Sequence, residues 1–163
     1  LVGSEMCIRD RTTTTTIAVI SCGAGSVFTG GLSYPTQQSV VLGSDTGTVV
    51  LNYNAAGVPD RFIVEWNSSV VIDTGYRGGA VYDFGGLGRS EFNNSLTGRI
   101  DPITLTTYPD LAIYPDDGYP RILGLGSGTT SFVKNSASPT TATVKVYGPT
   151  PGTAWDYILN CPV

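Results

Sequence analysis

Short runs in which apolar and polar residues alternate dominate the chain. In "RFIVEW", Phe62, Val64 and Trp66 share one face, and Ile63 and Glu65 share the other. A repeat of two residues is the period of a β-strand, so we expect the first face to be buried and Glu65 to lie on a solvated face. The following "NSS" lets the chain reverse before "VVIDTG", which predicts a β-hairpin.

The same alternation recurs along the chain, and glycine or proline interrupts every stretch before a helical repeat can establish itself. Between residues 85 and 128 the sequence is rich in Gly, Pro, Asn and Asp, which indicates loops or an extra hairpin. In the last third, Ala142, Val144 and Val146 alternate with polar residues, and further strands are predicted at 39–43, 47–54, 80–86, 129–134 and 153–161.

About eight short strands, each with one apolar face, predict an all-β fold, namely an antiparallel β-sandwich of the jelly-roll type. An immunoglobulin-like sandwich is the alternative. The Cys…Trp…Cys spacing of that fold is absent, because the cysteines lie near the two ends of the chain.

The first sixteen residues are unrelated to this pattern. "LVGSEMCIRDR", from Leu1 to Arg11, resembles the translation of a sequencing adaptor, and Thr12 to Thr16 form a low-complexity run. We therefore expect residues 1–16 to be an artefactual leader and linker without order, and residues 17–163 to form a single β-sandwich domain.

Composition and charge narrow the class of protein. The net charge is −4, and the nine Lys and Arg residues are scattered, so we expect no nucleic-acid partner, which would require a basic stripe. No apolar run approaches the roughly 20 residues that cross a bilayer. Only 13% of residues are charged, while 21 are Gly and 10 are Pro, which is typical of β-proteins and common in extracellular or virion proteins.

Two cysteines remain once Cys7 of the leader is set aside. Cys22 and Cys161 lie near the ends of the domain, and the first and last strands of a sandwich are often neighbours. We therefore predict a disulfide between them and an oxidising or extracellular setting. Two alternatives stay open: buried free thiols, or a lipidated Cys22 in a lipobox-like "VISC".

The residue inventory favours binding over catalysis. The chain contains no histidine, which removes Ser-His-Asp and Cys-His nucleophiles and most transition-metal sites, and we expect no cofactor. A glycan-degrading enzyme with two carboxylates is the alternative from another class, with Glu65, Asp73 and Asp83 as its candidates. We expect the protein not to be an enzyme.

Calcium is the metal that oxygen-rich loops of this kind can bind. Asp116 and Asp117 in "YPDDGYP" and Asp45 in "GSDTGT" are the candidate ligands. Because Asp-Gly is also common turn chemistry and no EF-hand spacing is present, the turn interpretation is favoured over a calcium site.

Saccharide binding needs exposed aromatic faces with polar groups beside them. The predicted loops offer Tyr76, Arg77, Tyr114, Asp117 and Tyr119. Tyr76 and Arg77 would form the exposed tip of "DTGYRGG". The alternative is that these tyrosines cover loop ends or make contacts between copies of the chain.

Two stretches resemble a known type of domain: "VPDRFIVEWNSSVVIDTGYRGG" and "GSGTTSFVKNSASPTTATVKVYGPTPGTAWDYILNCP". Together they resemble domains of marine phage virion and tail-fibre-type proteins and related secreted bacterial modules. The resemblance implies a β-sandwich on an extracellular particle, framed by two cysteines, and carries over no catalytic residue.

We therefore expect a structural or surface-recognition domain located on a virion or outside the cell. Its expected partners are other virion or surface proteins, a host surface glycan or further copies of itself. A carbohydrate-binding or adhesion module of a secreted bacterial protein is the second hypothesis.

Overall fold

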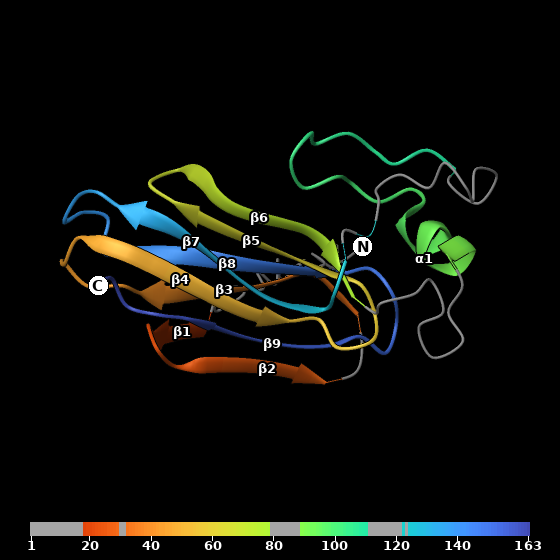
Figure 1. Ribbon diagram of the computed structural model, residues 1–163. Helices are drawn as coiled ribbons and strands as arrows, with labels where there is room; N and C mark the ends of the chain where they lie inside the picture. The colour runs from red at the N-terminus through yellow and green to blue at the C-terminus, as the bar shows by residue number, and fades with distance from the viewer. Residues whose placement is uncertain (1–17, 30–31, 79–88, 111–121, 123) are drawn as a thin grey trace, which may run out of the picture.

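A computed structural model describes residues 18–29, 32–78, 89–110, 122 and 124–163. These residues form nine β-strands and one α-helix (Figure 1). The elements are β1 (Ala18–Ser21), β2 (Gly25–Thr29), β3 (Ser33–Val41), β4 (Gly47–Asn54), β5 (Asp60–Trp66), β6 (Ser69–Arg77), α1 (Arg89–Leu96), β7 (Ser127–Lys134), β8 (Thr141–Gly148) and β9 (Ala154–Leu159). The leader predicted at residues 1–16 and the strand predicted at 80–86 lie outside the described residues.

The strands form two sheets that pack face to face. One sheet has the order β1-β3-β8-β5-β6 and the other the order β2-β9-β4-β7. Every pair of neighbouring strands is antiparallel except β1 and β3, which are parallel. The expected all-β sandwich is confirmed.

The order of pairing identifies the type of sandwich. β2 pairs with β9, β3 with β8, β4 with β7, and β5 with β6, so the chain folds back on itself as one long antiparallel hairpin that is wrapped into two sheets. This is jelly-roll connectivity, to which β1 adds one edge strand. An immunoglobulin sandwich instead places its first, second, fifth and fourth strands in one sheet, which does not match this order.

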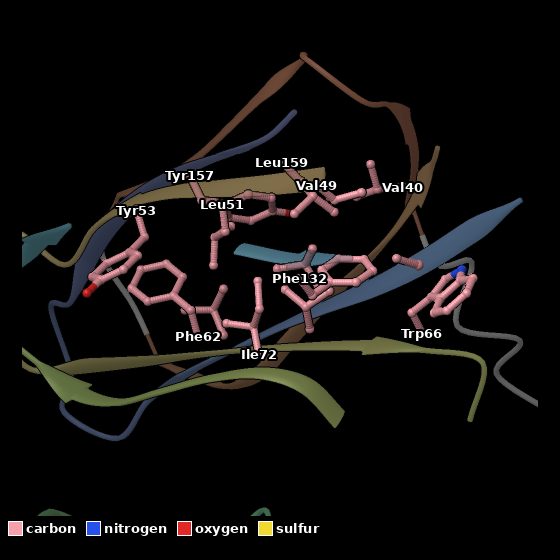
Figure 2. Packing of buried hydrophobic residues seen from close by; sticks show 14 of the residues in the cluster. Val40, Val49, Leu51, Tyr53, Phe62, Trp66, Ile72, Phe132, Tyr157 and Leu159 are labelled. Carbon is pink, nitrogen blue, oxygen red and sulfur yellow. The ribbon is translucent and has the colours of Figure 1, made fainter. Parts of the chain in front are cut away.

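The core between the sheets is built from the alternating residues that the sequence displays. Figure 2 shows Phe62 of β5 facing Tyr53 and Tyr157 from the opposite sheet. The rings of Phe62 and Tyr53 lie 5.2 Å apart, and Trp155 contributes a perpendicular ring 6.4 Å from Phe62. Each such side chain stabilises the fold by about 1.5–3 kcal/mol on full burial. The predicted inward faces of β5, β8 and β9 are therefore confirmed.

The predicted hairpin between β5 and β6 is also confirmed. Asn67 and Ser68 connect the two strands, with φ angles of 50° and 59°. Two consecutive positive φ angles are the mark of a tight turn whose twist matches that of the flanking strands, and Asn is one of the residues that tolerates them. The turn thus fixes which residues of β6 oppose β5.

The predicted disulfide joins Cys22 to Cys161, whose Cα atoms are 4.9 Å apart. Cys22 lies between β1 and β2, and Cys161 follows β9, so the bond closes the sheet edge where β2 and β9 pair. The alternatives of free thiols and of a lipidated Cys22 are therefore wrong.

Two expectations about the fold need correction. The region expected to be irregular contains the helix α1, whose eight residues are too few to cross a bilayer. The face of β5 expected to be solvated is covered as well, because Ile63 is buried in a second apolar cluster. In Figure 1 α1 lies beyond the arrowhead of β6, at one end of the sandwich, and residues 97–110 turn back above the end of β6.

A buried carboxyl group lies where β5 begins. Asp60 is fully buried, its Oδ1 accepts a 2.6 Å hydrogen bond from the Thr153 hydroxyl, and its Oδ2 has no partner among the described residues. Gly148 packs directly on this carboxyl, and a Cβ at that position would overlap it. Burial raises the pKa of Asp60 to about 8, against the opposing effect of the Thr153 hydrogen bond, so the group is protonated in the folded protein at neutral pH.

Asp60→Asn is expected to stabilise the protein increasingly as pH rises. The folded pKa lies above the ordinary value of 3.8, so native Asp60 holds a proton that the unfolded chain releases between those two values. The wild type therefore loses up to about 1.4 kcal/mol per pH unit between pH 4 and pH 8, and the neutral amide does not. Urea denaturation of both proteins from pH 4 to pH 9 measures the difference. The control is Asp45→Asn, on an exposed turn. Parallel profiles for wild type and Asp60→Asn would contradict the burial argument.

Removing the disulfide with Cys22→Ser and Cys161→Ser is expected to lower the free energy of unfolding by about 5 kcal/mol. The bond closes a loop with a sequence separation of 139 residues, and chain entropy sets this magnitude. Denaturant titration of the double variant and of the oxidised wild type measures the loss. Equal stability of the two proteins would contradict it.

Candidate functional site

A second apolar cluster covers part of the outer face of the five-stranded sheet. It combines residues of β5, β6 and β8 with residues from α1 and the segment that follows it. The Tyr76 and Phe92 rings meet edge to face at 5.2 Å, and so do those of Tyr34 and Tyr147. The buried members are Ile63, Tyr76, Phe92, Leu96, Tyr108 and Tyr147. This cluster fixes α1 and Tyr108 against the sheet.

An arginine at the base of the cluster holds two carboxylates. Arg61 Nε and Nη2 donate to the two oxygens of Asp73 at 2.8 and 2.6 Å, and Nη1 lies 3.5 Å from Asp101 Oδ2. The guanidinium also lies 5.8 Å from the centre of the Tyr76 ring. Burial alone would lower the pKa of Arg61, but hydrogen bonding and the charges of Asp73 and Asp101 raise it above its ordinary value. Arg61 therefore stays charged and ties β5 to β6 and to the segment after α1.

Asp101 organises that segment into a small hairpin, residues 99–108. Its Oδ1 accepts the backbone N–H groups of Ile103 and Thr104 at 2.8 Å, and its Oδ2 accepts the Tyr108 hydroxyl. Burial would raise the pKa of Asp101, but these hydrogen bonds and Arg61 lower it below its ordinary value. The hairpin is thus shaped around one ionised carboxylate.

A tyrosine and an arginine attach the hairpin to β3. The Tyr34 hydroxyl donates to the carbonyl of Ile100 at 2.9 Å, and the Arg99 guanidinium lies 4.7 Å from the centre of the Tyr34 ring. Arg99 also donates to the carbonyls of Ser95 and Pro149 at 2.6 and 3.2 Å, which links α1 to the end of β8. The hairpin is therefore held by contacts with β3, with α1 and with the residue that follows β8.

A groove of about 480 Å³ runs between this hairpin and the outer face of the sheet, and we call it the sheet groove. Its floor includes Tyr34, Tyr147 and the ion pair between Glu65 and Lys145, whose Oε1 and Nζ are 2.7 Å apart. Its wall is the hairpin, with Ile100, Pro102 and Leu105. Volumes of 300–1,000 Å³ are typical of sites for small ligands.

The wall presents apolar side chains on a backbone turn closed by a hydrogen bond. Leu105 is 76% exposed and Ile100 is 55% exposed. The φ angle of Leu105 is 58°, which is unusual for a bulky side chain, and the turn is closed by its N–H donating to the Asp101 carbonyl at 3.0 Å. A strained, exposed leucine beside a groove is the kind of feature that accompanies binding sites.

A second hollow of about 570 Å³ lies on the other side of Arg99, between α1 and the residues after β8. Glu91, Ser95 and Thr150 line it with polar groups, and the Ser95 and Thr150 hydroxyls are 3.3 Å apart. This hollow lacks the aromatic floor of the sheet groove.

The structure places the residues predicted from the sequence as follows. The expectation that Tyr76 and Arg77 form an exposed tip is wrong, because β6 continues through Arg77 and Tyr76 is only 1% exposed beneath α1. Burial raises the pKa of Tyr76 well above its ordinary value. Arg77 is half-buried and donates to the Thr74 carbonyl at 2.9 Å. Tyr76 therefore belongs to the cluster, and both residues lie in a strand and not in a loop.

The remaining candidates are only partly placed. Asp45 is exposed in the turn before β4, while its proposed companions Asp116 and Asp117, together with Tyr114, Tyr119 and Asp83, lie outside the described residues. Within the described ranges no group of three or more acidic or cysteine side chains has a metal-binding arrangement. Glu65 lines the sheet groove in its ion pair, and Asp73 is held by Arg61.

Sequence reasoning missed most of the groove. Tyr34 and the hairpin at residues 99–108 lie in stretches without a clear period, and their contacts with the sheet leave no local signal. Lys145 was detectable, since it alternates with the inward residues of β8 and so had to lie on the outer face. What the pattern could not reveal is that a hairpin forms a wall beside it.

Two comparisons with known proteins found no match. No protein-family model matches the chain, and a search of curated proteins found no match. The groove must therefore be interpreted from its own chemistry.

Asp101→Asn is expected to loosen the hairpin and to lower the free energy of unfolding by about 1–3 kcal/mol above pH 5, because Arg61 loses one of its two charged partners. The native pKa of Asp101 is depressed, so its contribution disappears as pH falls below about 4 and the two proteins converge there. Urea denaturation measures the stability, and hydrogen exchange at Ile103 and Thr104 measures the loosening. Asp156→Asn, on the other sheet, is the control. Unchanged exchange at those two amides would contradict the role of Asp101.

Proposed function

We propose that this domain is a non-enzymatic surface-recognition module, of the kind carried by virion fibres or by secreted adhesion proteins, and that it binds a saccharide in the sheet groove. The observation that carries the proposal is the groove itself, where tyrosines, exposed aliphatic side chains and one ion pair meet beside a hairpin held by the carboxylate of Asp101.

The chemistry of the groove suits a sugar. A pyranose ring has apolar C–H faces and a rim of hydroxyl groups, so its site needs apolar contact together with fixed donors and acceptors. Tyr34 and Leu105 offer the contact. Glu65 accepts hydrogen bonds and Lys145 donates them, and both remain partly accessible, with side chains 36% and 24% exposed.

The same groove offers little to a hydrolytic mechanism. Among the described residues that line it, Glu65 is the one carboxylate, and it is paired with Lys145. Glycoside hydrolysis generally uses two carboxyl groups about 5–10 Å apart, one of them as an acid. This supports binding without turnover as the function.

The disulfide between Cys22 and Cys161 supports an extracellular setting. A disulfide between the two ends of the domain persists in oxidising compartments and on particle surfaces. A jelly roll by itself hosts many functions, so the fold does not choose between a virion and a secreted protein. Neighbouring genes for capsid and tail proteins would favour the virion, whereas an upstream signal peptide and catalytic domain would favour the secreted module.

Glu65→Gln and Lys145→Met are each expected to weaken saccharide binding at least tenfold, since a hydrogen bond to a charged group contributes about 1.5–3 kcal/mol. Both variants are expected to remain within about 1 kcal/mol of wild-type stability, because the ion pair is accessible to solvent. A glycan array identifies the ligand, and calorimetric titration with that glycan measures affinity. Asp156→Asn on the other sheet is the control.

The outcomes separate the groove from the loops. Absence of binding to any glycan, or unchanged affinity in both groove variants, would contradict the proposed site. Loss of binding in Tyr119→Ala with unchanged groove variants would move the sugar site to the segment that contains residue 119.

A further inference from the structure

The two sheets present four edge strands with different degrees of protection. β1 and β6 border the five-stranded sheet, and β2 and β7 border the four-stranded sheet. β1 has four residues and β2 has five, which makes both poor templates for another strand. β6 is long, but its pairing with β5 is broken by two register shifts and its side chains include Asp73 and Arg77.

β7 has none of these protections. Its eight residues pair with β4 in an unbroken register, without a bulge or a proline. Its exposed side chains are those of Ser127, Thr129, Ser131 and Val133, and none is charged. Within the described ranges β7 pairs on one side only, and a regular, uncharged edge of this kind is a template for a further strand.

The lysine that would guard this edge is turned inward. Lys134 is fully buried, and its Nζ donates to the carbonyls of Asp45 and Ser136 at 2.8 and 2.7 Å. The ammonium group also lies 6.0 Å from the centre of the Trp66 ring. The ammonium group thus holds the turn before β4, and it leaves the exposed positions of β7 without a charged side chain.

We propose that β7 pairs antiparallel with β7 of a second copy of this chain, so that two four-stranded sheets join across a two-fold axis. Residues that face each other in an antiparallel pair point to the same side, which allows Thr130 to lie on the axis. Gly128 then faces Phe132, a small residue against a large one, and Ser127 faces Val133.

Charge is compatible with this arrangement. The outward positions of the neighbouring strand β4 are Thr48, Val50, Asn52 and Asn54, so the described strands on both sides of the junction oppose no like charges. The floor of the sheet groove comes from β3, β5 and β8 in the other sheet. A dimer through β7 therefore leaves two grooves available, and two linked sites raise avidity for a surface that displays many glycans.

The test is the mass of the full chain in solution, measured by sedimentation equilibrium over a range of concentrations. The wild type is expected to reach twice the mass of the chain. Thr129→Lys with Ser131→Lys is expected to raise the dimer dissociation constant about tenfold or more, because the introduced ammonium groups of one copy face those of the other. Val27→Lys, at an exposed position of edge strand β2, is the matched control and should leave the dimer intact.

Hydrogen exchange of the wild type provides a second measurement that does not depend on the folding of a variant. Amides of β7 are expected to exchange more slowly at concentrations where the dimer forms, while those of β2 stay unchanged. The proposal would be overturned if the wild type were a monomer at every concentration or formed a trimer. It would also be overturned if the dimer persisted in the β7 lysine variant or was lost in Val27→Lys, or if exchange in β7 did not depend on concentration.

Discussion

The side chain of Arg61 extends from the start of β5 on the outer side of the five-stranded sheet. Its guanidinium forms ion pairs with Asp73 of β6 and with Asp101 of the inserted hairpin. Removing charges from water is costly, and only a nearly complete set of partners compensates for it. The hairpin therefore has one position in which Asp101 reaches Arg61 while its other oxygen holds Ile103 and Thr104. The wall of the sheet groove depends on that placement.

The sandwich could be predicted from the sequence because its information is local. Phe62, Val64 and Trp66 recur at the strand period, and the paired turn residues Asn67 and Ser68 lie between two such runs. The second layer could not be predicted in this way. Ile63 and Tyr76 are buried because residues from the segment between β6 and β7 pack over them, and an alternating pattern does not show whether its other face is covered.

In the candidate site, too, some features could be predicted from the sequence and others could not. Glu65 and Lys145 could be assigned to the outer face from alternation alone, although their ion pair could not. Tyr76 and Arg77 looked like a loop tip because Gly75 and the glycines after Arg77 are typical of turns, yet Gly75, with φ of 62°, lies inside β6. Two of the motifs that carried the resemblance meet in the fold, since Thr153 of "GTAW" donates a hydrogen bond to Asp60 of "PDRF". These motifs contribute to the closure of the sandwich, and they do not indicate a ligand.

The disulfide has a mechanical consequence. A pull applied to the chain before Cys22 and after Cys161 reaches the sulfur–sulfur bond first, because the polypeptide between them forms a closed loop with a sequence separation of 139 residues. Tension therefore bypasses the strands from β2 to β9, which lie inside the closed loop, and only β1, which precedes Cys22, lies on the loaded path. A module that holds a particle or a cell against flowing liquid would keep its binding face undistorted under drag.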